Sequence, residues 1–239
     1  MTQEMGESLI YSWLRHVKGC QIVQTNWKVS PAWQTTERED FIKILENAKD
    51  WFKEVNGVKK ELGFKKEKKL INNLFKTTEC DVLGIKFNNS TNIIYAVEVA
   101  YHENGLDYGG ARINTIEKVL SKCLRIAICV MSVFPNTPAE IYFVTPVTKN
   151  NIGKQYNFYK TIQRCFEKLN EKFGNNISFF FVSNEGSKKN IKELKTEDNR
   201  NKFNEEVIIP LIKKVDDYSD TSELFIRSIK LYKQVKENK

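Results

Sequence analysis

The sequence predicts an α/β fold in which helices flank a mixed central β-sheet. Segments with strand-like and helix-like hydrophobic periodicity alternate along most of the chain, which is typical of layered α/β domains. Two apolar segments near the middle are separated by turn-forming residues 88–92, a pattern that predicts an antiparallel hairpin. The 239 residues, 41% of them hydrophobic, suffice for the core of one domain. We therefore expect a single domain over residues 1–239, with a helical insertion at residues 31–79 and C-terminal helices at residues 202–239.

The first elements are predicted to be a helix and a strand. Apolar side chains recur every three to four positions in residues 4–17, so an amphipathic helix is expected there. Residues 20–28 contain alternating apolar and polar side chains and end before Pro31, which predicts a strand. Residues 35–78 begin with acidic side chains typical of a helix N-terminus and continue at helical spacing, so we expect an inserted pair of helices.

The centre and the C-terminal half predict the rest of the sheet and its helices. The hairpin strands are expected at residues 80–87 and 93–100, and a long amphipathic helix follows at residues 111–134 and ends at Pro135. The remaining predicted elements are a strand at 140–147, a helix at 156–173, a strand at 177–182, and helices at 202–215 and 221–236.

The charge of the chain favours a polyanionic partner such as nucleic acid. Lys and Arg total 38 against 30 Asp and Glu, which gives a formal charge of +8. Residues 59–69 contain six lysines and two glutamates. Within this segment Lys65, Lys66, Lys68 and Lys69 are candidate phosphate contacts, and a solvated helix face is the alternative interpretation.

Several classes of protein lack their sequence signals here. The longest apolar segments are far shorter than the roughly 20 residues of a membrane-spanning helix, and the acidic N-terminus does not resemble a signal peptide, so a cytoplasmic protein is expected. The five cysteines are scattered, which predicts reduced core residues rather than a disulfide framework or a zinc site. The chain contains no phosphate-binding loop, dinucleotide-binding fingerprint, esterase nucleophile elbow or zinc-protease motif.

Two acidic residues of the predicted hairpin are the strongest candidates for chemistry. Glu98 lies in a strand so apolar that both of its faces are expected to be covered, and Asp81 begins the neighbouring strand. If the turn centres between Asn89 and Ser90, Asp81 lies directly opposite Glu98. Carboxylates about 5 Å apart repel unless a cation lies between them or one is protonated. A hard cation, Mg²⁺ or Mn²⁺, is therefore expected there, although a shift of one residue in the register would separate the two acids.

The order of these elements resembles the PD-(D/E)XK nuclease superfamily, which has the restriction-endonuclease-like fold. The resemblance is carried by an acid on the first helix, Glu7, by Asp81 at the start of a hairpin, and by Glu98 on its second strand. It implies that Asp81 and Glu98 bind a divalent metal and that Glu7 completes the site. It also implies a lysine two residues after Glu98, where this chain has Ala100.

The helix after the hairpin could supply the missing ammonium group. Lys118 and Lys122 are one helical turn apart on it, and some members of the superfamily recruit the basic residue from another element. His102, in the loop after the Glu98 strand, is a candidate substrate contact. The resemblance thus implies a Mg²⁺-dependent deoxyribonuclease, an endonuclease of the restriction or defence type, acting on DNA, with RNA and a homodimer left open.

Structural interpretations remain open for each of these residues. Asp81 could be a turn residue at the start of a strand, and Glu98 could pair with a buried arginine such as Arg112 or Arg125. Glu7 could have only a structural role, because the helix dipole stabilises an acidic side chain near a helix N-terminus. Lys118 and Lys122 could simply belong to the polar outer face of their helix. For the whole protein, the alternatives are a catalytically inactive nucleic-acid-binding module and a protein-interaction scaffold.

Overall fold

The computed structural model describes residues 3–30, 32–33, 74–101, 105–108, 112–148, 158–173, 176–185 and 202–217. Within these ranges the chain forms an α/β fold with helices on both faces of a five-stranded mixed sheet, as predicted. The elements in chain order are α1 (Gln3–Ser12), the π-helical turn η1 (Trp13–Val17), β1 (Ile22–Trp27), β2 (Cys80–Lys86), β3 (Ile93–Val99), α4 (Arg112–Val133), β4 (Ala139–Thr148), α5 (Phe158–Phe173), β5 (Ile177–Glu185), the π-helical turn η2 (Asn204–Ile208) and α6 (Ile209–Asp217).

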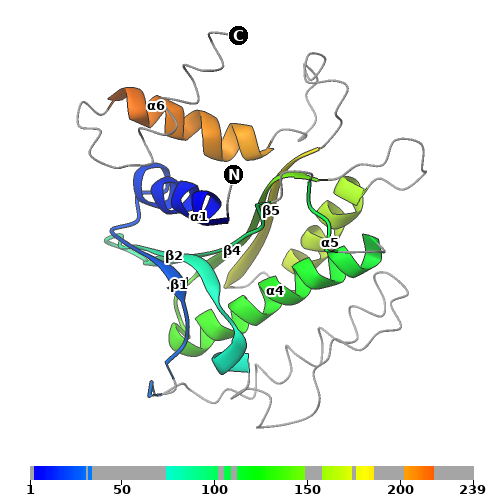
Figure 1. The fold of residues 1–239 in the computed structure, drawn as a ribbon. Coiled ribbons are helices and arrows are strands. Elements are labelled where there is room, and N and C mark those ends of the chain that lie inside the picture. Colours follow the sequence, from blue (N-terminus) through cyan, green and yellow to red (C-terminus); the bar gives the residue numbers. More distant parts are fainter. Residues whose placement is uncertain are drawn as a thin grey trace.

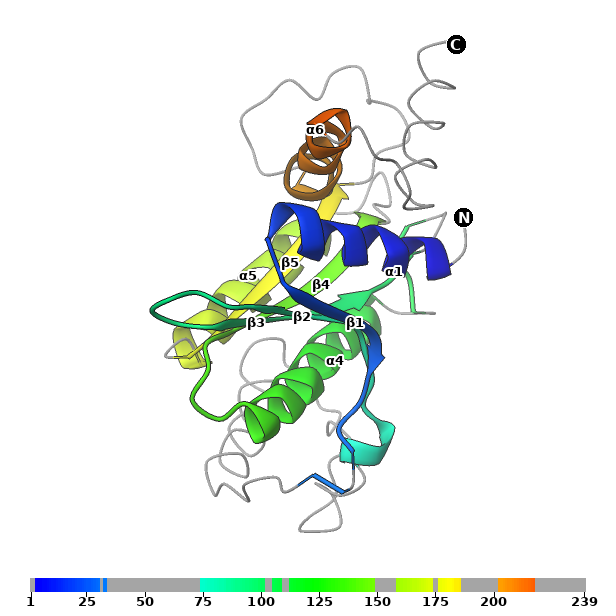
Figure 2. The ribbon, with the colours of Figure 1, turned by 90° about the vertical axis from the view of Figure 1, so that its left-hand side faces the viewer.

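The sheet has the strand order β1-β2-β3-β4-β5. β2 is antiparallel to both β1 and β3, whereas β3, β4 and β5 run parallel to one another. Parallel neighbours need a crossover connection. α4 makes this connection between β3 and β4, and α5 makes it between β4 and β5, so both helices cover the same face of the sheet (Figures 1 and 2).

Two apolar cores lie on the two faces of the sheet. On one face α4 and α5 pack against side chains such as Leu83 and Ala96, and on the other face α1, η1, η2 and α6 pack against side chains such as Val82 and Val97. Because successive side chains of a strand point to opposite faces, β2 and β3 contribute to both cores. The two hairpin strands are consequently buried over most of their length, and Figure 2 shows the resulting three layers.

The N-terminal helical segment is held on the sheet by an aromatic and ionic cluster. The Trp13 indole N–H donates a hydrogen bond of 2.8 Å to the Glu206 carbonyl oxygen of η2. The Lys18 ammonium group lies 5.0 Å from the Trp13 ring and donates a 2.9 Å hydrogen bond to the Tyr142 hydroxyl of β4. These contacts connect the N-terminal helical segment to the sheet and to the C-terminal helical segment, although Glu206 and Tyr142 are far from Trp13 and Lys18 in sequence.

The predicted elements agree with the observed ones to within a few residues at each end. The helix predicted at residues 4–17 is present, but its last turn is π-helical, with Lys18 N–H bonded to the Trp13 carbonyl at 3.0 Å. The helix predicted at residues 202–215 contains a second π-helical turn. All five cysteines have free thiols and are buried, which confirms their assignment as core residues. The inserted helices, apart from residues 74–78, and the helix predicted at residues 221–236 lie outside the described residues.

None of the helices in the described ranges combines the length and the apolar character that crossing a membrane requires.

A close approach at Gly84 lets η1 and the residues after it pack directly on β2. A Cβ atom at this position would lie 2.9 Å from Cys20 Sγ and 3.1 Å from Leu14 Cδ1. Both distances are too short for an unperturbed van der Waals contact, so a larger residue would force its neighbours to shift.

We predict that Gly84→Ala lowers the free energy of unfolding by about 1–3 kcal/mol through this overpacking. Urea unfolding followed by circular dichroism measures the change. Cys20→Ala in the same chain should recover part of the loss, because it removes the sulfur atom nearest to the new methyl group. Strictly additive effects in the double-mutant cycle would contradict the contact.

Candidate functional site

The two acidic residues of the hairpin lie opposite each other. β2 and β3 pair Val82 with Val97 and Leu83 with Ala96. Continuing this register by one residue places Asp81 opposite Glu98, which is the register expected from the sequence. At the same end of the hairpin, the Val99 backbone N–H donates a 2.6 Å hydrogen bond to the Asp81 carboxylate.

Both carboxyl groups are buried, and burial makes their charged forms costly. Asp81 is 8% exposed and Glu98 is 4% exposed. Burial, followed by the nearby Glu98 charge, raises the pKa of Asp81 from 3.8 to about 7. Burial likewise raises the pKa of Glu98, against the opposing effect of Lys122. The hairpin therefore holds two proximate acids in an environment that favours their protonation or the binding of a cation.

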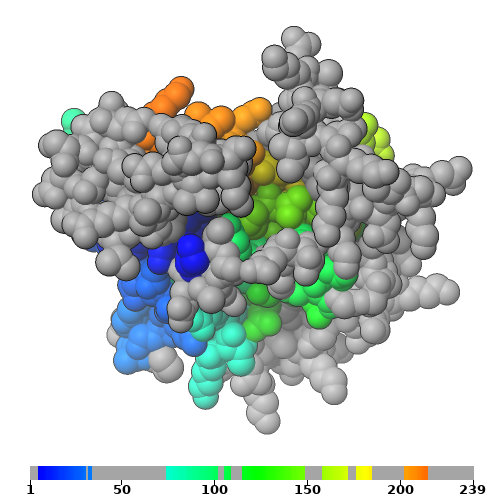
Figure 3. Space-filling view, turned by 45° about the horizontal axis from the view of Figure 1, so that its top comes forward, coloured from blue at the N-terminus to red at the C-terminus, as the bar shows by residue number. Residues whose placement is uncertain are grey.

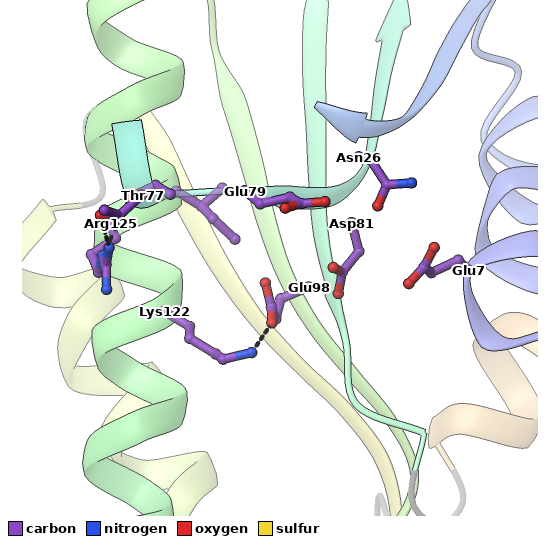
Figure 4. Close-up of a pocket in the computed structure, with 10 residues that line it drawn as sticks. Glu7, Asn26, Thr77, Glu79, Asp81, Glu98, Lys122 and Arg125 are labelled. Carbon is purple, nitrogen blue, oxygen red and sulfur yellow. Dashed lines mark hydrogen bonds and ion pairs between the residues drawn. The ribbon is translucent and has the colours of Figure 1, made fainter. Parts of the chain in front are cut away.

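Lys122 supplies one positive charge to this pair. It extends from α4, and its ammonium group forms an ion pair and a hydrogen bond with the Glu98 carboxylate (Figure 4). Although burial opposes the charged form, the contact with Glu98 outweighs it and raises the pKa of Lys122 above its usual value. Glu98 is thus paired with Lys122 rather than with Arg125, one of the arginines considered as its partner.

Lys118 lies one helical turn before Lys122 and has a different contact. Its ammonium group donates a 3.1 Å hydrogen bond to the Tyr108 backbone carbonyl and lies 5.5 Å from the Tyr108 ring centroid. The Lys122 ammonium group lies 5.6 Å from the same ring. The structure therefore brings Lys122, and not Lys118, against the Glu98 carboxylate. Lys118 instead bonds to the Tyr108 backbone.

Glu7 reaches the site from the opposite side of the sheet. It belongs to α1, and its side chain points toward Asp81 in Figure 4. The position of α1 depends on Gly6, because a Cβ atom there would lie 2.8 Å from the Tyr101 ring and 3.0 Å from Val99. This close packing of the helix on the end of β3 brings Glu7 to the pocket.

The acids, Lys122 and the side chains around them line an open pocket of about 300 Å³. Five lining residues were not identified as site residues from the sequence; they are Asn26, Thr77, Thr78, Glu79 and Ile126. Arg125 also lines it, although the sequence suggested it only as a partner of Glu98. The pocket contains four acidic and two basic side chains. Two of the segments that line it, β1 and the residues preceding β2, adjoin at the surface in Figure 3.

Asn26 is the one non-glycine residue in the described ranges with a positive φ, at 52°. It lies on β1 between the pairs that Thr25 and Trp27 form with β2, next to Asp81. Asparagine tolerates this left-handed conformation better than most residues, and such strained positions concentrate at functional sites. The irregular backbone presents the Asn26 carboxamide to the pocket (Figure 4).

Some of these residues carried a signal that sequence reasoning could have used. Thr77, Thr78 and Glu79 immediately precede β2 and Asp81, and Arg125 is three residues from Lys122 on the same helix face. No local pattern marks Asn26, because its place depends on the register between β1 and β2. Lys65, Lys66, Lys68, Lys69 and His102 lie outside the described residues.

The donor set fits a magnesium-type ion better than a metal that needs a closed cage of protein ligands. Within the described ranges, no three His, Cys, Asp or Glu side chains are grouped closely enough to hold an ion by themselves. Mg²⁺ typically takes only one or two carboxylates from the protein, with water and phosphate as its other ligands. Asp81 and Glu98 match that requirement, because they are two buried oxygen donors facing each other in an open pocket.

Comparisons of the chain with protein-family models, with curated proteins and with solved structures find no match. The geometry of the pocket is therefore the basis for inferring its chemistry.

We predict that Asp81→Asn stabilises the protein at alkaline pH in buffer containing a chelator. Between about pH 4 and pH 7 the folded state binds more protons at Asp81 than the unfolded state does, so the stability of the wild type falls as the pH rises through this range. An asparagine does not titrate, and its carboxamide oxygen can still accept the Val99 hydrogen bond. The melting temperature of the variant should exceed that of the wild type at pH 8 and approach it at pH 5.

Glu167→Gln, on the exposed face of α5, is the matched control and should show little difference between the two pH values. Loss of stability in Asp81→Asn at pH 8 would mean that the Asp81 carboxylate is required for folding.

Proposed function

We propose that this chain has the restriction-endonuclease-like fold and acts as a Mg²⁺- or Mn²⁺-dependent endonuclease that cleaves DNA. The observation that carries the proposal is the pair of buried carboxylates, Asp81 and Glu98, facing each other in an open pocket with Lys122 against one of them. An acidic pair of this kind repels the phosphates of a nucleic acid unless a cation is present. The proposal therefore requires a divalent metal, and the donor set is suited to one.

Asp81 and Glu98 would hold the metal as its two protein ligands, and Glu7, which is not grouped with them as a third ligand, would add acidic charge to the pocket from α1. When bound, such an ion polarises a phosphate oxygen and lowers the pKa of a coordinated water. The protein supplies two carboxylates whose positions are set by the hairpin ladder and by the Val99 hydrogen bond. Their burial excludes bulk water on the protein side, which strengthens electrostatic interactions at the reacting phosphate.

Lys122 takes the part that the resemblance assigns to a lysine at position 100. Ala100 is buried among apolar side chains of the core that α4 covers, and Lys122 extends from α4 toward the same carboxylates. An ammonium group there can orient the attacking water and stabilise negative charge that develops on the phosphate. The excess of positive charge over the whole chain supports a polyanionic substrate.

A catalytically inactive nucleic-acid-binding module is the second candidate. The observation that favours it is the Lys122–Glu98 ion pair, because it compensates one of the two buried carboxylates without a metal. The two functions differ in a single measurable respect, which is cleavage.

We predict that the purified protein cleaves plasmid or linear DNA in the presence of Mg²⁺ or Mn²⁺ and not in the presence of a chelator. Asp81→Ala and Glu98→Ala should each abolish cleavage and leave the circular dichroism spectrum unchanged, because each removes a metal-binding oxygen donor and keeps the apolar cores. Gel electrophoresis of the products measures the activity. Binding of DNA without cleavage under all these conditions would favour the inactive binding module.

We predict that Lys122→Ala lowers turnover by a factor of about 100 or more, with little change in DNA affinity, because its ammonium group acts mainly in the transition state. Lys118→Ala is the matched control: it removes the same group one turn away, where it contacts Tyr108. Single-turnover rates and DNA dissociation constants, measured separately, distinguish the two effects. Equal losses of rate in both variants would contradict the assignment to Lys122.

A further inference from the structure

Arg125 is a second basic side chain of the pocket, and hydroxyl groups hold it in place. Its Nη2 atom donates a 2.6 Å hydrogen bond to Thr77 Oγ1, and its Nε atom donates a 3.3 Å hydrogen bond to Thr78 Oγ1. Both threonines belong to the segment that leads into β2, so the guanidinium group spans the gap between this segment and α4 (Figure 4).

The charge of Arg125 has no acidic partner in the described part of the chain. Glu98 forms an ion pair with Lys122. Glu79 forms an ion pair with Lys28, with 2.6 Å between the ammonium nitrogen and the carboxylate oxygen. Arg125 lines the same pocket as both of these acids and forms an ion pair with neither. A half-buried cation that is fixed by neutral oxygens keeps its charge available for an anion.

The chemistry of the guanidinium group indicates which anion it suits. Its planar fork of N–H donors matches phosphate oxygens, and the two threonine hydrogen bonds limit its rotation before any ligand arrives. Lys122 and Arg125 are three residues apart on one face of α4. They are thus separated by about 4.5 Å along the helix axis. A backbone phosphate at the carboxylates would therefore leave Arg125 to contact a different phosphate of the same strand.

We infer that Arg125 binds a backbone phosphate of the nucleic acid next to the phosphate that lies at Asp81 and Glu98. This inference rests on the proposed function and adds a substrate contact to it. The α4 wall of the pocket then binds the anionic strand, and the wall formed by β1 and α1 carries the acid Glu7 and the Asn26 carboxamide.

The alternative role for Arg125 is structural, as a tie between α4 and residues 77–78. The two roles make different predictions. A tie depends on the threonine hydroxyls and affects stability, whereas a phosphate contact depends on the positive charge and affects the salt dependence of binding. Each neutralised phosphate of duplex DNA contributes about 0.9 to the slope of log affinity against log salt concentration.

The test measures the binding of a labelled DNA duplex by fluorescence anisotropy over a series of NaCl concentrations. Ca²⁺ replaces Mg²⁺, because it has the same preference for oxygen ligands, and electrophoresis verifies that the duplex stays intact. Arg125→Gln removes the positive charge, and Arg125→Lys keeps it. Thr78→Val replaces the hydroxyl group by a methyl group of nearly equal size. Arg164→Gln is the control, because it removes a positive charge from the exposed face of α5.

Arg125→Gln is expected to reduce the magnitude of the salt slope by about 0.9, the contribution of one phosphate. Arg125→Lys, Thr78→Val and Arg164→Gln should keep the wild-type slope, and Thr78→Val should lower only the melting temperature. In a chelator, Arg125→Gln and the wild type should have equal affinities, since the uncompensated acids then keep phosphate out of the pocket.

A wild-type slope in Arg125→Gln, together with a lowered melting temperature, would overturn the phosphate contact while leaving the proposed nuclease intact. A wild-type protein that binds no duplex in Ca²⁺ and cleaves none in Mg²⁺ would overturn both the proposed function and the inference.

Discussion

The repulsion between two buried carboxylates is the constraint on which the pocket depends. Asp81 and Glu98 face each other because the β2–β3 register requires it, and neither can reach water easily because helices cover both faces of the hairpin. Removing such charges from water costs free energy that a single ion pair with Lys122 offsets only in part. A proton or a cation between the two acids relieves this cost, and the proposed metal would act in this way.

The helices around the hairpin differ in what they contribute to this site. α4 crosses one face of the sheet as the connection between the parallel strands β3 and β4, and it carries both Lys122 and Arg125 to the pocket. α1 covers the other face and brings Glu7 to the end of β3, where Gly6 permits close packing. One end of the β2–β3 hairpin thus receives basic side chains from one helical layer and an acidic side chain from the other. This asymmetry is the physical basis on which the proposed nucleic-acid strand is assigned to the α4 side.

Local strain and local order occur together at the pocket. Asn26 adopts a left-handed backbone conformation beside Asp81, whereas Arg125 is held by the hydroxyls of Thr77 and Thr78. A strained backbone conformation persists only where the surrounding structure holds it in place. The Thr25 and Trp27 pairs with β2 hold the Asn26 backbone from both sides. Both features present polar groups in fixed directions, which reduces the entropy lost when a ligand is bound.

The sequence by itself determined the order of the described elements and the burial of the cysteines and, for a turn centred between Asn89 and Ser90, the pairing of Asp81 with Glu98, because these follow from local patterns. Turn residues 88–92 set the hairpin register, and strand periodicity sets which side chains face the same way. Only the tertiary structure decided between Lys118 and Lys122, which sequence spacing leaves equivalent, and only it brought Asn26 and Arg125 to the pocket. These residues depend on how α4 crosses the sheet and how β1 aligns with β2, and such long-range packing has no signal in a short stretch of sequence.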